Sequence, residues 1–590
     1  MNDYPILRAA VQPVIGILSV AGVIASLASW NDSGLSSPGI LCVVQASEAS
    51  PLIRGADAGS FRDRFGGESA GGAGSGLPRP ASAAAGGGPD RGARADWPQL
   101  QQNAQRHGRA VVEVPPPYRA RWIWFGPGYQ LRNFESKRAA GWDADLSSAE
   151  GKNYPMPDTL PMSFAGSMQP ICAAGRLFVA DCQGKVYALR SDDGKTLWTG
   201  YNPGGTLWPG VATEEIVAFA SVFGYVTAWQ AATGHRLWQY DTGKSITSAP
   251  ALVGDTVYVA GQSGRVYALR LSDGKELWKS EDLGAPIQGG LCVANGRVYV
   301  GTEAMEAFAL DAGTGKILAR SEKLMGQSFR LVWPVAVADR VIFTTVPIVC
   351  VGSEYVNDPV IAGRDPKFGA VGWDPKLKPA YPDVASEQAA MRRWLSGEGK
   401  VWQVHYALRA DNLRQDYIIA TGATEGCGTP PNPPAIDHKG RPLLWWASGH
   451  GTLIRKCGFG TNFTTDISAL DVQTGDRILI DNGRYADQTT ETDNLYAMST
   501  GGRYLYLRQN FRGTSAINLE TSEHNRISAI YRQWDGGGWQ SPINYAQGDG
   551  GHVRVPRTPP APAGRVAPII ADGRLYFTEH FCVTCVETAQ

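Results

Sequence analysis

The sequence has no excess of charge of either sign. Among 590 residues, 55 Lys and Arg balance 55 Asp and Glu, so the formal net charge at pH 7 is zero. A protein that attracts nucleic acid or an anionic membrane through its overall field carries a basic excess, and no run of basic residues stands out here. We therefore expect no nucleic acid among the partners, and membrane contact only through an amino-terminal anchor.

Motifs for metal, haem or redox chemistry are also missing. The sequence contains no CxxCH, no adjacent Cys–Cys pair and no zinc-site spacing of cysteines with histidines. The one close pair, Cys582 and Cys585 in "CVTC", lies among strand-like residues, whereas a redox motif activates its thiolate at a helix start. We interpret both as buried or independently paired cysteines, with the redox motif as the alternative, and predict no catalytic, cofactor-binding or metal-binding residue.

Long apolar runs are limited to the amino-terminal region. The stretch "VIGILSVAGVIASLA", residues 14–28, is short for a membrane span, and "VVQA" at residues 43–46 ends in small residues suited to cleavage. We predict that residues 1–46 are an export signal, or alternatively an uncleaved membrane anchor. Cys42 follows a leucine, so we expect no lipid anchor. The mature protein is expected to be periplasmic or otherwise extracytoplasmic, either secreted or anchored.

The next segment is rich in small residues. Residues 47–95 include "GGESAGGAGSGLPRPASAAAGGGPDRGAR", which is dominated by Gly, Ala, Ser and Pro. Such a composition cannot bury enough apolar surface to order itself. We predict a disordered linker over residues 47–95 and a folded domain over residues 96–590.

A short phrase then recurs along the chain. "DDGKTLW" at residues 192–198, "ATGHRLW" at 232–238 and "SDGKELW" at 272–278 place their tryptophans 40 residues apart. A weaker copy, "GTGKILA" at residues 313–319, follows at a spacing of 41. A fixed period near forty residues is typical of repeat architectures.

Each repeat reads as four short strands. In the best-formed copy, "APALV", "TVYVA" and "RVYAL" are separated by turn residues and are followed by the recurring phrase. A four-stranded antiparallel unit of this length is typical of a propeller blade. The turn after the third strand recurs near residues 193, 233, 273, 314, 412, 474, 521 and 587. We predict an all-β fold, an eight-bladed β-propeller, with seven blades as the alternative.

The last repeat is one strand short. It stops at "VETAQ", where every earlier unit turns into its fourth strand. The segment "YRARWIWFG", residues 118–126, is strand-like and contains Trp122 and Trp124 without a complete unit of its own. We predict that this amino-terminal strand pairs with residues 582–586 and closes the ring, because closure removes both exposed sheet edges.

We interpret the recurring phrase as a structural element of the fold and not as a set of catalytic or ligand-binding residues. Its glycine turns the chain from the third strand into the fourth, and its tryptophan packs beside the next sheet with the indole N–H on a carbonyl. A row of tryptophans that binds a ligand is the alternative, which is weakened because Ala319 replaces the tryptophan in the fourth copy. The predicted structural residues are Gly194, Trp198, Gly234, Trp238, Gly274, Trp278, Gly315 and Gly475.

The regular spacing of the repeats is interrupted in the fifth unit. Residues 352–400 form an insertion in which helix-forming residues predict one short helix that ends at Gly397. Insertions in repeat proteins map to loops on one face, where binding surfaces are often built. We expect the ligand surface on such a face, at residues 352–400 and 426–450, where proline, glycine and aromatic residues accumulate without regular strands.

The repeats resemble a known family. "VYALRSDDGKTLW" and "VYALRLSDGKELW" resemble the tryptophan-docking repeats of propellers related to the pyrroloquinoline-quinone-dependent alcohol dehydrogenases, and "DWPQLQQNAQRHG", residues 96–108, is similar to a leader that precedes such propellers. That superfamily also includes the non-enzymatic lipoprotein of the outer-membrane barrel-assembly machinery. Its quinone enzymes commonly have an adjacent Cys–Cys pair and a calcium or lanthanide ion held by Glu, Asn and Asp. This sequence has no such pair, and Asp466, Asp471 and Asp493 do not fit the metal motif.

Two functions from different classes follow. The favoured hypothesis is an exported propeller that binds or scaffolds a protein or another component of the cell envelope, without a cofactor and without catalysis of its own. The alternative is an alcohol or sugar dehydrogenase that uses pyrroloquinoline quinone with calcium or a lanthanide. A hydrolase with an unrecognised arrangement of residues is a weaker third hypothesis, since a fold alone does not determine function.

Overall fold

The computed structural model describes residues 96–127, 130–132, 162–326, 328–345, 404–420, 433–448, 464–475, 477–479, 495–509, 513–521, 523–527, 567–578 and 582–588. All of them belong to one compact unit, Arg94–Gln590. The predicted export signal at 1–46, the linker at 47–95 and the insertion at 352–400 with its short helix lie outside the described residues.

The described strands form eight sheets, which we number as blades. Blade 1 contains β4 (Ile171–Ala173), β5 (Arg176–Ala180), β6 (Lys185–Arg190) and β7 (Thr196–Tyr201); blade 2 contains β8 (Val211–Ala212), β9 (Ile216–Ala220), β10 (Tyr225–Gln230) and β11 (Arg236–Asp241). Blade 3 contains β12 (Ala251–Val253), β13 (Thr256–Ala260), β14 (Val266–Arg270) and β15 (Glu276–Lys279); blade 4 contains β16 (Cys292–Ala294), β17 (Arg297–Thr302), β18 (Glu306–Asp311) and β19 (Ile317–Arg320).

The later blades are built in the same way from longer stretches of sequence. Blade 5 contains β20 (Val335–Val337), β21 (Arg340–Thr344), β22 (Val404–Arg409) and β23 (Gln415–Ala420); blade 6 contains β24 (Ala435–Ile436), β25 (Pro442–Ser448), β26 (Thr464–Leu470) and β27 (Arg477–Leu479). Blade 7 contains β28 (Leu495–Gly501), β29 (Tyr504–Gln509), β30 (Gly513–Asn518) and β31 (His524–Ile527), with β1 (Arg109–Ala110) added; blade 8 contains β32 (Ile569–Ala571), β33 (Arg574–Thr578) and β34 (Val583–Thr588).

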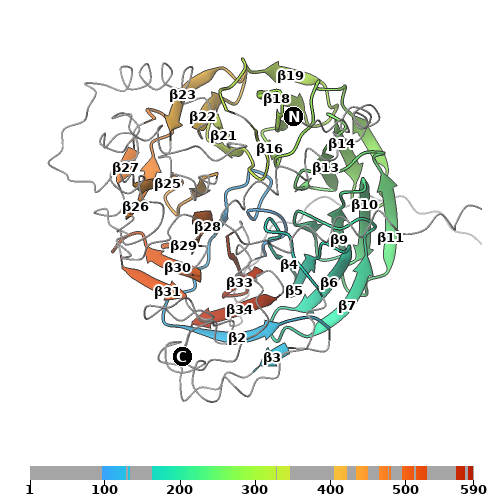
Figure 1. Ribbon diagram of the computed structural model, residues 1–590, viewed down its shortest axis with the longest axis vertical. Helices are drawn as coiled ribbons and strands as arrows, with labels where there is room; N and C mark the ends of the chain where they lie inside the picture. Colours follow the sequence, from blue (N-terminus) through green and yellow to red (C-terminus); the bar gives the residue numbers. More distant parts are fainter. Residues whose placement is uncertain are drawn as a thin grey trace, which may run out of the picture. The chain divides into compact units, whose positions relative to one another are not determined.

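The eight blades follow one another around a ring, with the first strand of each blade inside and the fourth outside (Figure 1). This arrangement confirms the eight-bladed propeller and excludes the seven-bladed alternative. The described residues form strands and turns and contain no helix. Accordingly, no described segment is a helix with the length and apolar character needed to cross a bilayer.

The middle strands are buried on both faces. In β13, the four residues from Val257 to Ala260 are all buried, and β6 shows the same continuous burial from Val186 to Leu189. A blade in the ring is covered by a neighbour on each side, so its central strands need apolar residues at consecutive positions instead of alternating ones.

The ring is closed by the amino-terminal strand. Strand β2 (Tyr118–Trp124) pairs antiparallel with β34, with Tyr118 opposite Thr588 and Trp124 opposite Val583. It supplies the missing fourth strand of blade 8, and β3 (Gln130–Arg132) pairs with its outer edge. The predicted closure is therefore confirmed.

Neighbouring blades are joined by a repeated contact between a tryptophan and a glycine. The Trp198 indole N–H donates to the Ala231 carbonyl at 2.9 Å, and a Cβ atom at Gly234 would lie 2.6 Å from Trp198 Cδ2. The same pairing joins Trp238 to Gly274 and Trp278 to Gly315, and their indoles donate to the carbonyls of Leu271 at 2.7 Å and Ala312 at 3.0 Å. Each glycine has φ of 72° to 74°, so both the backbone and the indole favour a residue without a side chain.

The same contact closes the seam between blades 8 and 1. Trp122 of β2 donates its indole N–H to the Ser191 carbonyl at 3.2 Å and packs on Gly194, where a Cβ atom would lie 2.6 Å from the indole. Trp124 donates to Thr196 Oγ1 at 2.9 Å. The amino-terminal strand thus reproduces, at the seam, the contact made inside the continuous part of the ring.

The contact is replaced between blades 4 and 5. Ala319 stands where a tryptophan is found in the earlier blades, and the facing turn has Leu413, at φ 58°, in place of glycine. There the Tyr299 hydroxyl donates to the Ala410 carbonyl at 2.8 Å. The tryptophan and the glycine that are missing from the repeat pattern would have contacted each other, so both changes affect the same contact between blades. Between blades 5 and 6, Tyr417 takes the indole's place against Gly475 and donates to the Val472 carbonyl at 3.0 Å.

Candidate functional site

The centre of the ring contains residues 96–110, which we call the axial segment (Figure 1). It runs past the first strands of blades 1 to 7 in chain order. In each of these strands, one main-chain N–H donates to the segment at 2.7–3.2 Å. The donors and acceptors are Cys172 to Trp97, Ala212 to Pro98, Leu252 to Gln99, Val293 to Ala104, Ala336 to Gln105, Ile436 to His107, and Thr500 to Gly108.

These bonds satisfy the inner edges of the sheets. The first strand of a blade has a neighbour on one side only, so its other edge presents unpaired N–H groups toward the centre. Six of the seven acceptors are main-chain carbonyls of the axial segment, and the seventh is the side-chain oxygen of Gln99. The Gln99 amide also donates to the Leu252 carbonyl at 3.1 Å, so its side chain imitates a strand neighbour.

Two buried glutamines extend the contact to blade 8. Gln101 donates to the Met498 carbonyl at 3.0 Å and pairs with Gln169, which precedes blade 1. Gln169 in turn donates to the Ala567 carbonyl of blade 8 at 2.9 Å and accepts from the Trp97 indole at 3.2 Å. The axial segment thus bonds directly to blades 1 to 7 and is linked to blade 8 through Gln169.

Arg106 anchors the segment near blades 3 and 4. Its guanidinium is fully buried and donates to four main-chain carbonyls, those of Leu291 at 2.8 Å, Leu100 at 2.9 Å, Pro250 at 2.6 Å and Ala249 at 3.3 Å. Burial lowers the pKa of Arg106 to about 9, so the side chain stays charged at pH 7. A buried charge is tolerated when its hydrogen-bonding groups are satisfied, and the four carbonyls accept from four of the five guanidinium N–H groups.

Apolar side chains fill the space beside the axial segment. Leu100 belongs to a buried cluster with Trp208, Trp333 and residues from the first strands of blades 5 and 6. The two indoles meet edge to face with centroids 6.2 Å apart, and the Trp208 N–H donates to the Thr247 carbonyl at 2.9 Å. At the level of these residues the centre of the ring is therefore packed.

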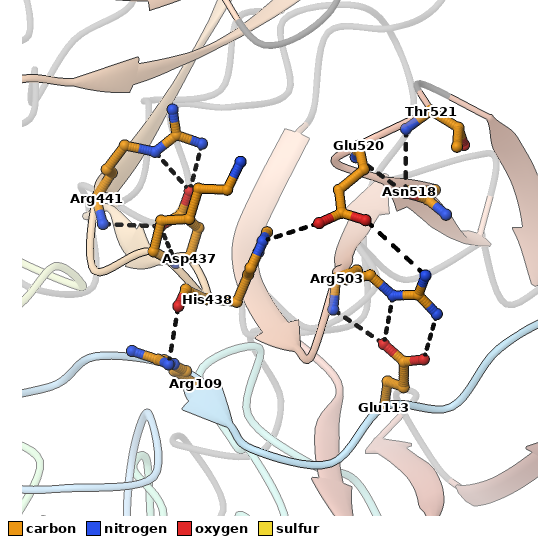
Figure 2. A network of polar contacts seen from close by, with 10 residues as sticks. Arg109, Glu113, Asp437, His438, Arg441, Arg503, Asn518, Glu520 and Thr521 are labelled. Atoms are coloured by element: carbon orange, nitrogen blue, oxygen red, sulfur yellow. Dashed lines mark hydrogen bonds and ion pairs between the residues drawn. The ribbon is translucent and has the colours of Figure 1, made fainter.

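A polar network holds the end of the axial segment (Figure 2). Glu113 accepts from the Arg503 guanidinium at 2.8 Å, and this contact lowers the pKa of Glu113. Glu520 lies 3.4 Å from His438 Nε2 and 3.9 Å from the Arg503 guanidinium. Arg109 donates to the His438 carbonyl at 3.2 Å. The network joins turns of blades 6 and 7 to the chain as it leaves the centre, but its exposed ion pairs contribute little stability individually.

The strand order assigns the long connections to one face. In each blade, the turn from second to third strand and the connection to the next blade leave from the same end of the sheet, opposite to the other two turns. Strand β21 ends at Thr344 and β22 begins at Val404, while β23 ends at Ala420 and β24 begins at Ala435. The chain therefore leaves this end at Thr344 toward residues 352–400 and at Ala420 toward the first part of residues 426–450, and we call this end the long-connection face. The turn between β24 and β25, also within 426–450, lies at the opposite end.

One expectation about these segments was wrong. Residues 426–450 were expected to lack regular strands, but they include β24 and β25 of blade 6. Proline at 442 is the first residue of β25, a position where its missing N–H is tolerated, and Leu443 and Leu444 behind it are buried. The remainder of both segments lies outside the described residues.

The cysteines and acidic residues show no catalytic arrangement in the described parts. Cys585 is fully buried, and burial raises its pKa, the opposite of what a redox thiolate needs. Asp471 accepts from the main-chain N–H of Gln473 at 2.9 Å and so acts as a turn residue. Asp466 lies on β26, and Asp493 falls outside the described residues. Within the described ranges, no three His, Cys, Asp or Glu side chains are grouped closely enough to hold a metal ion.

The structure brings the predicted tryptophans and glycines of the repeats together in pairs between neighbouring blades. The position of the axial segment at the centre of the ring was not predicted from the sequence. Trp198, Trp238 and Trp278 each face a glycine of the next blade, and none of them lies in the axial segment. The leader "DWPQLQQNAQRHG" was noted for its resemblance alone. The signal that was available is its composition: amide side chains, one tryptophan and no strand periodicity directly before a repeat domain.

Comparison with known proteins supports the resemblance of the repeats. The sequence model of a family described as outer membrane protein assembly factor BamB matches residues 132–281 and 273–399. The outer membrane protein assembly factor BamB of Salmonella typhimurium is 34% identical over 99 residues, which cover 15% of this chain and 24% of that protein. The chain thus spans about a quarter of that relative's length.

Quinone enzymes are similar as well. The quinohemoprotein alcohol dehydrogenase of Comamonas testosteroni is 25% identical over 212 residues, covering 33% of this chain and 30% of that protein. Its crystal structure has a TM-score of 0.46 and 12% identity, covering 84% of this chain and 81% of the other. In sequence, parts of the chain are thus similar to members of both groups that its repeats resemble.

Proposed function

We propose that this chain, whose repeats are similar to those of an outer membrane protein assembly factor, is an exported propeller that binds a protein or another component of the cell envelope. In this proposal it has no catalytic activity of its own and needs no cofactor. The observation that carries the proposal is the axial segment, because it occupies the inner edges of blades 1 to 7 and leaves the faces of the ring for a partner.

The long-connection face is the side that we assign to the partner. Described residues at this end include exposed aromatic side chains, with Phe223 in the turn from β9 to β10 and Tyr201 at the end of β7 exposed at 54% and 58%. Exposed aromatic residues are enriched in protein interfaces, and among the described residues no turn at the opposite end has an exposed Phe, Tyr or Trp. The expected insertions depart from the same end.

A photo-crosslinking experiment tests this assignment. A crosslinking amino acid replaces Phe223 at the long-connection face, and the matched control replaces Glu215, which is exposed in the turn between β8 and β9 at the other end of the same blade. We expect specific crosslinked envelope proteins from position 223 and few from position 215. Identical crosslinking from both positions, or none from either, would contradict the proposed partner face.

The alternative is an alcohol or sugar dehydrogenase that uses pyrroloquinoline quinone with calcium or a lanthanide. The similarity to a quinohemoprotein alcohol dehydrogenase favours it. The described residues do not fit this cofactor, because the axial segment takes up the inner edges and Asp471 is engaged in a turn. Calorimetric titration with the quinone, with and without metal, and a dye-linked oxidation assay separate the two functions. Tight metal-dependent binding with substrate-dependent dye reduction would establish the dehydrogenase instead.

Export is part of the proposal. Sequencing the amino terminus of the mature protein tests the expected cleavage after Ala46, and fractionation tests the periplasmic or other extracytoplasmic location. A cytoplasmic protein that retains Met1 would contradict it.

A further inference from the structure

We infer that the first strands of the blades form a peptide-binding site at the centre of the ring, and that residues 96–110 are its tethered ligand. Seven main-chain N–H groups, one from each of blades 1 to 7, converge on this segment in chain order. The segment contributes no strand longer than the two residues of β1 and turns on itself, with the Arg106 N–H donating to the Asn103 carbonyl at 3.0 Å. It is held to the ring by bonds to its main chain and by a few specific side chains. This inference concerns the centre of the ring, a site other than the partner face of the proposed function.

The geometry defines what the site recognises. The ligand is a peptide with tight turns over residues 99–105 that presents carbonyl groups to the inner strands, an amide side chain to blade 3 and a guanidinium near blades 3 and 4. Arg106 makes the most specific contact, because its planar fork places three buried hydrogen bonds on carbonyls of the ring, those of Leu291, Ala249 and Pro250, and a fourth on Leu100 within the segment. Gln99 and Gln101 add two side-chain contacts that an apolar residue cannot reproduce.

The connection between ligand and ring is short and accessible. The segment leaves the centre through Ala110, and the next residue, Val111, is 84% exposed. The ring continues from Val114, whose N–H donates to the Tyr506 hydroxyl at 2.9 Å, into β2, which closes it. A cut after Val111 therefore separates the ligand from the ring without opening the seam.

The experiment inserts a protease recognition sequence after Val111 in the full-length chain. After cleavage at about 1 µM protein, we expect the amino-terminal fragment to co-elute with the ring in size-exclusion chromatography, because bonds to seven blades hold it without the covalent link. A fluorescent synthetic peptide of residues 95–110, added in excess, is then expected to replace the fragment, with a rise in anisotropy. Hydrogen exchange reports the inner-strand amides directly, and their protection should persist with the peptide bound.

Two variant peptides provide the matched control. Arg106→Met removes a charge with three buried hydrogen bonds to the ring and one within the peptide, and Arg109→Met removes a charge with one partly buried bond to His438. We expect the first to bind at least about 100-fold more weakly and the second to bind within about threefold of the original peptide. Co-expression of residues 1–111 and 112–590 as two chains repeats the test if the insertion prevents folding. Separation of the fragment on cleavage, failure of the peptide to enter, or equal affinities of the two variants would each overturn the inference.

Discussion

The glycine–tryptophan contact between blades predicts that two glycines of the same blade respond very differently to the same substitution. Gly274 and Gly254 both have positive φ, 72° and 58°, so alanine is strained at either position. A Cβ atom at Gly274 would lie 2.5 Å from Cδ2 of Trp238, whereas at Gly254 it would meet nothing within 4 Å. The two variants therefore share the cost of backbone strain and differ only in the clash with the indole.

The magnitude follows from these two contributions. An alanine forced into a left-handed conformation costs roughly 1–2 kcal/mol. Crowding a packed contact adds typically 1–3 kcal/mol. We therefore expect Gly254→Ala to lower the free energy of unfolding by about 1–2 kcal/mol and Gly274→Ala by about 2–5 kcal/mol. In a Trp238→Ala background, the extra cost of Gly274→Ala should disappear, because no indole remains to be crowded.

Urea unfolding followed by circular dichroism measures all four variants without relying on tryptophan fluorescence. The double-mutant cycle isolates the contact between Trp238 and Gly274 from the strain that both glycine variants share. Equal losses for Gly254→Ala and Gly274→Ala, or an unchanged cost of Gly274→Ala in the Trp238→Ala background, would refute the reasoning that these glycines accommodate an indole.

Three further predictions rest on other features. Replacement of Trp198, Trp238 or Trp278 by alanine should each cost about 3–5 kcal/mol in chemical unfolding, and three unchanged midpoints would point to ligand-binding tryptophans instead. Deletion of residues 1–94 should leave thermal stability unchanged, whereas deletion of residues 1–130 should destabilise or aggregate the protein because it removes the axial segment and β2; equal stability of the two truncations argues against the closed ring. Burial lowers the pKa of His405 to about 3 from 6.5, so the unfolded chain binds the proton first and stability, complete above pH 6.5, falls as the pH drops toward 3. Between pH 6.5 and 4.5 the loss from this group should reach roughly 2–3 kcal/mol, and His405→Gln should abolish it in urea titrations at the two pH values.

The blades were predictable because their signals are local. The glycine of each turn, the apolar middle strands and the closing tryptophan all lie within about forty residues of one another, as in other repeat proteins. Ring closure was also predictable, since the last unit lacked a strand and residues 118–126 had no unit of their own. Both inferences required only counting strands within a known period.

The axial segment was not predictable in the same way. Its partners are main-chain groups of seven different blades, and a main-chain N–H leaves no trace in the amino-acid sequence. Arg106 reads as an ordinary charged residue until the four carbonyls around it are located. The sequence also did not indicate that Ala319 and Leu413 replace the two partners of one contact, because these residues are brought together only when blades 4 and 5 pack.

The closed seam ties the beginning of the domain to its end. Arg121 of β2 forms an ion pair with Glu587 of β34 at 3.0 Å, across a sequence separation of 466 residues. The axial segment and β2 emerge first during synthesis, yet the strand that β2 pairs with emerges last, and contacts of such separation form slowly. Each new blade meets an axial segment that is already present and that offers the next acceptor in order. The amino-terminal residues can thus act as a template on which the blades are added one after another, and the ring is completed only when the last strand arrives.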